Sequence, residues 1–168
     1  MAEYEQIFLS DEILALMRNA ARLAGEFKEP FITVRTLLVA LTEEPTLGEA
    51  LVEVLPREKL ENYELPEDAG TRLTASRVPE PNAVAGERPA LLRFNTLAFK
   101  TPDGSKSVWL SREAHSVWHE AARRVEEGAK FMPKHLAFAI AADAIRSPGV
   151  FKAMKVSPGD VTEVLLKL

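Results

Sequence analysis

The chain has 168 residues, with 25 acidic and 21 basic side chains and a formal net charge of −4 at neutral pH. This charge argues against nucleic acid as a partner, because a surface that follows phosphates needs a dense excess of lysine and arginine. The chain has no cysteine, which excludes disulfides, thiol nucleophiles and thiolate metal sites.

The start of the chain and its hydrophobic pattern indicate a cytoplasmic protein. Residues 1–6 are acidic and lack the basic region and the apolar stretch of a signal peptide. No uninterrupted apolar run approaches the roughly 20 residues that span a bilayer. We therefore expect a cytoplasmic location and no membrane partner.

Residues 9–62 contain start signals for four helices. Ser10 is a typical N-cap, and the acidic pair Asp11-Glu12 suits the positive end of a helix dipole. Apolar residues then recur at helical spacing up to Gly25, where we expect the helix to end. The expected starts of the next three helices are Thr33, Thr46 and Pro56. The predicted inward-facing residues are Ile13, Met17, Ala20, Ala24, Leu37, Leu38, Leu41, Leu47, Ala50, Leu51, Val54 and Leu60.

Residues 63–109 are expected to form an insert. The stretch from Pro66 to Pro89 is rich in proline and poor in large apolar residues, which is typical of a loop. Residues 91–100 alternate and favour strand, and they lead into Pro102-Asp103-Gly104-Ser105. This pattern predicts a β-hairpin, which must pack on the helices to persist.

Residues 110–168 repeat the plan of residues 9–62. Leu110-Ser111-Arg112-Glu113 echoes the sequence before the first helix, and Ala121-Ala122-Arg123 follows at the same internal distance as Ala20-Ala21-Arg22. Two copies of one unit usually pack as a pseudo-symmetric pair. We therefore predict an all-α fold of two pseudo-symmetric four-helix repeats around the insert.

The helix signals of the second repeat match those of the first. The predicted helix limits are Ser111, Gly128, Pro133, Ser147-Pro148 and Ser157-Pro158. The predicted inward-facing residues are Ala114, Val117 or Trp118, Ala121, Val125, Leu136, Ile140, Ala144, Val150, Phe151, Met154, Val161, Val164 and Leu165.

Aligned with itself, the repeat resembles the Clp N-terminal repeat, the double four-helix module that precedes the ATPase rings of Clp unfoldases. The motifs that carry the resemblance are Leu9-Ser10-Asp11 and Leu110-Ser111-Arg112, the segments 33–41 and 132–140, and Gly149-Val150-Phe151. The resemblance covers residues 9–62 and 110–168 and leaves out the insert.

The resemblance implies a single Clp-N-like domain that binds substrate proteins, adaptors or a Clp ATPase in regulated proteolysis. It implies no chemistry and no cofactor, and the chain has no Gly-x-x-x-x-Gly-Lys-Ser/Thr phosphate loop. Two other functions remain open: a structural or self-associating protein on the same fold, and a helical domain that binds a small ligand or a metal.

The resemblance also implies a binding site in each repeat. In some relatives the cap hydroxyl and first-turn amides hold the phosphate of phosphoarginine, and a glutamate in the second helix holds its guanidinium. Here Arg35 and Lys134 occupy the two glutamate positions, and a cation there would repel a guanidinium and favour a carboxylate or phosphate. The candidate contacts for a peptide or an anion are Ser10, Arg35, Thr36, Ser111, Lys134 and His135. The alternative is that these residues are only helix caps and solvated residues at helix starts.

Two further groups are candidate sites. His115 and His119 lie one helical turn apart, a spacing that suits a metal pair, although we predict no metal and no catalytic residue. The large aromatic residues of the insert and the second repeat are Phe94, Phe99, Trp109 and Trp118. They are expected either to pack the hairpin on the helices or to line an apolar groove for a partner.

Overall fold

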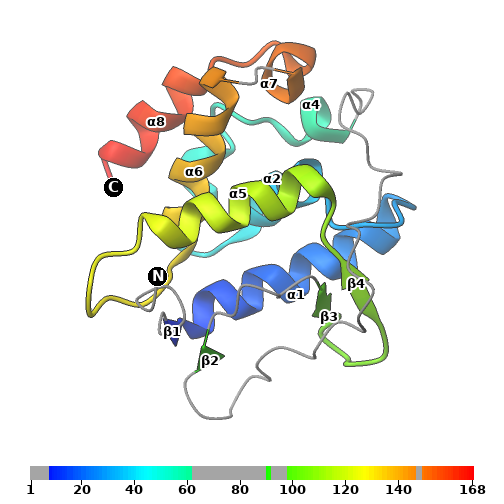
Figure 1. The fold of residues 1–168 in the computed structure, drawn as a ribbon. Helices are drawn as coiled ribbons and strands as arrows, with labels where there is room; N and C mark the ends of the chain where they lie inside the picture. Colours follow the sequence, from blue (N-terminus) through cyan, green and yellow to red (C-terminus); the bar gives the residue numbers. More distant parts are fainter. Residues whose placement is uncertain (1–7, 62–89, 92–97, 147–148) are drawn as a thin grey trace.

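Helices make up most of the chain that the computed structural model describes, which comprises residues 8–61, 90–91, 98–146 and 149–168. The mainly α-helical fold agrees with the prediction (Figure 1). The helices are α1 (Asp11–Glu26), α2 (Val34–Glu43), α3 (Gly48–Leu51), α4 (Arg57–Glu61), α5 (Arg112–Arg123), α6 (Pro133–Arg146), α7 (Gly149–Met154) and α8 (Pro158–Leu166). The strands are β1 (Phe8–Leu9), β2 (Ala90–Leu91), β3 (Ala98–Lys100) and β4 (Ser107–Trp109).

The predicted N-caps of the longer helices are confirmed. The side chains of Ser10, Thr33 and Ser111 accept hydrogen bonds from backbone N–H groups three residues ahead, which satisfies donors that a helix start leaves unpaired. Ser157 is also an N-cap, but its side chain makes no capping bond, and Pro158 follows in the first turn. The predicted start at Ser147-Pro148 lies outside the described residues.

The predicted cap at Thr46 is wrong. Helix α3 begins at Gly48, and a carboxylate oxygen of Glu44 accepts hydrogen bonds from the backbone N–H groups of Thr46 and Leu47 at 2.9 and 2.8 Å. The Thr46 hydroxyl also donates to this oxygen, at 2.6 Å. A charged acceptor makes stronger hydrogen bonds than a hydroxyl, so the buried Glu44 organises this turn.

Neither Gly25 nor Gly128 ends a helix. Helix α1 continues to Glu26, and the left-handed residue after it is Lys28, with φ of 55°. Helix α5 ends at Arg123, and Gly128 takes a φ of 82° in the loop that follows. Helix α1 passes the glycine because the N–H of Phe27 still bonds to Leu23 O, at 2.9 Å, and the Phe27 ring packs against the core.

The predicted hairpin is present in part, as the antiparallel pair β3 and β4, which packs on α1 (Figure 1). Of the rest of the strand predicted over residues 91–100, Leu91 belongs to β2, which pairs with β1, and residues 92–97 lie outside the described residues. Its turn is held by the Asp103 carboxylate, which accepts hydrogen bonds from the Thr101 hydroxyl and from the hydroxyl and backbone N–H of Ser105. These bonds lower the pKa of Asp103 to about 2. Gly104 adopts a φ of 74°, a conformation that glycine takes without a steric penalty.

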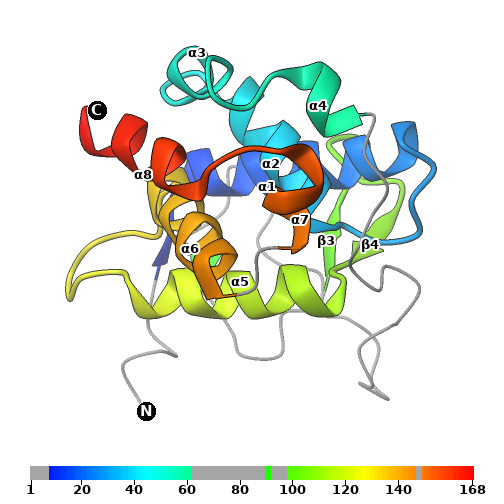
Figure 2. The same ribbon diagram turned by 90° about the horizontal axis from the view of Figure 1, so that it is seen from above.

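The two halves of the chain share one hydrophobic core. Helix α1 packs against α2, and α5 packs against α6. Across the halves, α1 meets α6, α5 meets α2, and α2 meets α6. Figure 2 shows α5 on the opposite side of the molecule from α3 and α4.

The predicted inward-facing residues are confirmed with few exceptions. All of those in α1 and α2 are fully buried, and so are Leu51, Leu136 and Leu165. Ala50, Val54, Val125 and Val164 are only partly buried, and the side chains of Ala144 and Val150 lie outside the described part. No helix within the described ranges is long and apolar enough to cross a membrane.

Candidate functional site

The candidate residues for a peptide or an anion lie at two places where helix N-termini meet, each combining the two halves of the chain. At the first, the N–H of Ser10 bonds to the carbonyl of Phe131 at 3.1 Å, and the N–H of Phe131 bonds to Phe8 O at 2.8 Å. The starts of α1 and α6 therefore lie side by side. Isolated parallel bridges join Leu9 to Phe131 here and Ile32 to Leu110 at the second place.

The second place joins the starts of α5 and α2 with equivalent bonds. The N–H of Ser111 bonds to Ile32 O at 2.9 Å, and the N–H of Ile32 bonds to Trp109 O at 2.7 Å. Each half thus presents its first helix to the second helix of the other half. The sequence indicates the two copies, but this crosswise pairing appears only in the structure.

The cap residues Ser10 and Ser111 are buried, with 2% and 0% of their surface exposed to solvent. Ser10 Oγ accepts a hydrogen bond from the N–H of Ile13 at 3.1 Å and donates to Phe131 O at 2.7 Å. Ser111 Oγ accepts from the N–H of Ala114 at 3.1 Å. Both serines therefore act as helix caps, which is one of the two roles that the sequence allowed for them; the other was contact with a ligand.

At the start of α2, Thr36 and Arg35 are also engaged within the protein. The fully buried Thr36 accepts a hydrogen bond from the N–H of Thr33 at 2.8 Å, and Thr33 accepts one from the N–H of Thr36, which completes a capping box. The Arg35 guanidinium lies 3.4 Å from a carboxylate oxygen of Glu29 and 5.7 Å from the centre of the Phe27 ring.

Glu29 is a buried carboxylate that the sequence analysis missed. Its side chain is 6% exposed, and one of its oxygens accepts a hydrogen bond from the Thr33 hydroxyl at 2.6 Å. Burial raises the pKa of Glu29 above its ordinary value, while the bond from Thr33 and the charge of Arg35 oppose this rise. Arg35 therefore compensates a buried charge that belongs to the protein itself.

The start of α6 repeats this capping arrangement with an imidazole. His135 Nδ1 accepts a hydrogen bond from the N–H of Met132 at 2.9 Å, and the ring packs edge-on against Phe131. This bond requires a neutral ring with its proton on Nε2. Burial, and secondly the charge of Lys134, lower the pKa of His135. Lys134 itself is exposed.

The capping bond of His135 predicts a pH dependence of stability. Since its pKa in the folded chain lies below the ordinary value of 6.5, the unfolded chain takes up this proton first as the pH falls. The stability from this group is therefore complete above pH 6.5 and is lost as the pH falls through the folded pKa. We expect His135→Gln to remove this loss, because glutamine at this position can accept the same backbone bond.

Urea titrations of the wild type and His135→Gln between pH 8 and pH 5 test this prediction. The free energies of unfolding should agree within about 0.5 kcal/mol at pH 8 and diverge in favour of the variant below pH 6.5. Other acidic groups cancel in the difference between the two proteins. Parallel pH profiles would contradict the neutral, accepting imidazole.

The aromatic candidates divide between core and surface. Phe99 and Trp118 are 3% and 1% exposed and pack edge to face, with ring centres 5.1 Å apart. These two side chains join the hairpin to α5 and do not line a surface groove. Trp109 is half-buried, and Phe94 lies outside the described residues.

His115 and His119 share one face of α5, with ring centres 4.5 Å apart. Among the described residues, no group of three or more histidine or acidic side chains is placed to hold a metal ion. The structure thus brings the pair together, as the helical spacing predicts, and adds no third ligand from this part of the chain.

No family model, curated protein or solved structure matches the chain.

A surface cleft of about 700 Å³ lies between the C-terminal half of α1 and the hairpin turn. Its lining combines Arg22 and Lys106 with Asp103 and Glu29. Asp103 already holds the turn and Glu29 already accepts from Thr33, so the acidic groups of this cleft serve the fold.

Proposed function

We propose that this chain is a cytoplasmic protein-binding module of the Clp-N type, built from two pseudo-symmetric four-helix repeats. In this proposal it binds substrate proteins, an adaptor or a Clp ATPase in regulated proteolysis, and it catalyses no reaction. The repeats would be residues 9–62 and 110–168, joined by the insert.

The crosswise bonding of the two halves is the observation that supports this proposal most. Four backbone bonds form two equivalent pairs: Ser10 to Phe131 corresponds to Ser111 to Ile32, and Phe131 to Phe8 corresponds to Ile32 to Trp109. The second helices also begin alike, since Thr36 and His135 both accept from the backbone N–H three residues before them. Such reciprocity is expected of two copies of one unit.

The hydroxyl groups at the helix starts are not placed to act as nucleophiles. The hydroxyls of Ser10 and Thr36 each donate and accept within the protein, and Ser111 serves as a buried cap. An activated nucleophile needs a base within hydrogen-bond reach and an approach for substrate. These buried caps offer a substrate no such approach.

Chemical crosslinking in the native host, followed by capture of the tagged chain, tests the proposal. We expect recovery of a Clp ATPase, a Clp protease subunit or unfolded client proteins. A purified Clp ATPase from the same host, assembled with its protease subunit, should then degrade a client at a changed rate when the chain is added. A tight homo-oligomer by light scattering, with no protein captured and no change in degradation, would instead favour the self-associating alternative.

A further inference from the structure

A groove of about 570 Å³ lies between the first half of α1 and the end of α2. Its apolar lining includes Leu16 and Ala40, which are 4% and 1% exposed, and the exposed Ala15. Ala15 is the exposed apolar residue of this lining, while Leu16 and Ala40 lie beneath it. The volume lies in the range of pockets that hold small ligands or a few side chains.

All the ionisable side chains among the described residues that line this groove are carboxylates. They are Asp11, Glu12, Glu43 and Glu44. Asp11 and Glu12 are exposed in the first turn of α1 and form no ion pair with another described residue. Glu44 is buried and caps the turn before α3.

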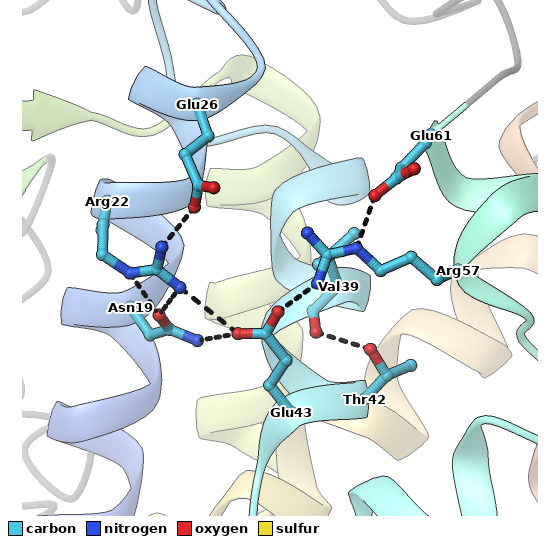
Figure 3. Close-up of polar contacts among 8 residues, drawn as sticks. All are labelled: Asn19, Arg22, Glu26, Val39, Thr42, Glu43, Arg57 and Glu61. Atoms are coloured by element: carbon cyan, nitrogen blue, oxygen red, sulfur yellow. Dashed lines mark hydrogen bonds and ion pairs between the residues drawn. The ribbon is translucent and has the colours of Figure 1, made fainter.

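Glu43 is already paired, but its network keeps a net negative charge (Figure 3). Its carboxylate contacts Arg57 of α4, and it accepts from Asn19 of α1 at 2.9 Å and lies 3.4 Å from Arg22. The two guanidinium groups also contact Glu26 and Glu61. Three carboxylates thus share two cations, and of these five charged side chains Glu43 is the one that lines the groove.

We propose that this groove binds a short segment of a partner protein in which an aliphatic side chain is flanked by lysine or arginine. The aliphatic side chain would pack on the exposed Ala15, above the buried Leu16 and Ala40, and the cations would lie against Asp11 and Glu12. The distance along α1 from Asp11 to Asn19 is about 12 Å, which suits two turns of a helix or a few extended residues. This inference rests on the proposed protein-binding function and adds the chemistry of the partner.

The test uses a fluorescent amphipathic lysine–leucine peptide of about 12 residues, or about 18 Å as a helix, and a glutamate–leucine peptide as its reversed-charge control. Fluorescence anisotropy measures binding to the purified chain. We expect the basic peptide to bind, its affinity to fall with added salt, and the acidic peptide not to bind.

Two pairs of variants distinguish binding in the groove from a general attraction of the basic peptide to an acidic protein. Glu12→Lys reverses a groove charge, and Asp160→Lys makes the same kind of change in the exposed first turn of α8, with the same cost to a helix dipole. Ala15→Trp fills the groove, and Ser116→Trp places the same side chain on the exposed face of α5. All four positions are exposed, so each variant is expected to fold, which thermal unfolding checks.

We expect Glu12→Lys to weaken the basic peptide by about fivefold and Ala15→Trp by about tenfold or more, with both controls within about twofold of wild type. The groove is not the binding site if Glu12→Lys and Asp160→Lys weaken peptide binding equally, or if Ala15→Trp binds the peptide as tightly as the wild type. If a Clp component is captured but peptide affinity does not change in the groove variants, the proposed groove site is wrong and the proposed function stands. If peptide affinity changes as expected in the groove variants but no Clp component or client is captured, the proposed function is wrong and the groove site stands.

Discussion

Replacing Trp118 with alanine is expected to lower the free energy of unfolding by about 3–5 kcal/mol. The indole stacks on Phe131 with ring centres 4.5 Å apart and meets Phe99 edge to face. It therefore joins α5, the hairpin and the segment before α6 in one aromatic cluster. Its loss would leave a cavity at the junction of the two halves.

Trp118→Phe and Ser116→Ala provide the comparison for this prediction. The Trp118 Nε1 atom has no hydrogen-bond partner among the described residues, so phenylalanine gives up no bond to them and should cost less than alanine. Ser116 is exposed on the same helix, and its change should stay within about 0.5 kcal/mol. Urea unfolding followed by circular dichroism measures all three, and a small loss in Trp118→Ala would contradict the central position of this ring.

Removing the charge of Arg35 is expected to cost about 3 kcal/mol, because Arg35→Met leaves the Glu29 carboxylate buried without its cation. The two side chains are 10% and 6% exposed. Removing both charges in Arg35→Met with Glu29→Gln should recover much of the loss, since neutral side chains escape most of the desolvation cost. A double-mutant cycle by urea unfolding gives this coupling energy.

Exposed cations supply the control for this cycle. Lys134 holds the equivalent position in the second half and is exposed, and Lys167 pairs with Glu163 at 3.5 Å on the surface of α8. Methionine at either position should change the free energy of unfolding by less than about 1 kcal/mol. Additive effects of Arg35→Met and Glu29→Gln would contradict the compensating pair.

The Arg35 pair also bears on the ligand that the family resemblance implies. A charge reversal at Arg35 would place a second carboxylate beside Glu29, so it would disturb folding before it reported on ligand binding. Lys134 is exposed and is the better position for testing an anion contact. The surroundings of Arg35 and Lys134 therefore differ, although the backbone bonds of the two halves correspond.

The helical plan follows from local signals. The caps at Ser10, Thr33 and Ser111 act over three residues, and the inward faces follow from a spacing of 3.6 residues per turn. The hairpin turn is equally local, because Asp103 bonds to Thr101 and Ser105. Some signals were misread: at Thr46 the nearby Glu44 carboxylate holds the turn, and α1 continues past Gly25 to a Phe27 that packs against the core.

The sequence by itself determined the starts of α1, α2 and α5, most of the buried faces and the hairpin turn, because these depend on neighbours within a few residues. Only the tertiary structure decided that the first helix of each half lies beside the second helix of the other half, that the Arg35 guanidinium lies beside the Glu29 carboxylate, and that an acidic groove remains beside Ala15. These features depend on which surfaces meet in the common core. That choice is made by the packing of the whole chain, and no spacing within one helix encodes it.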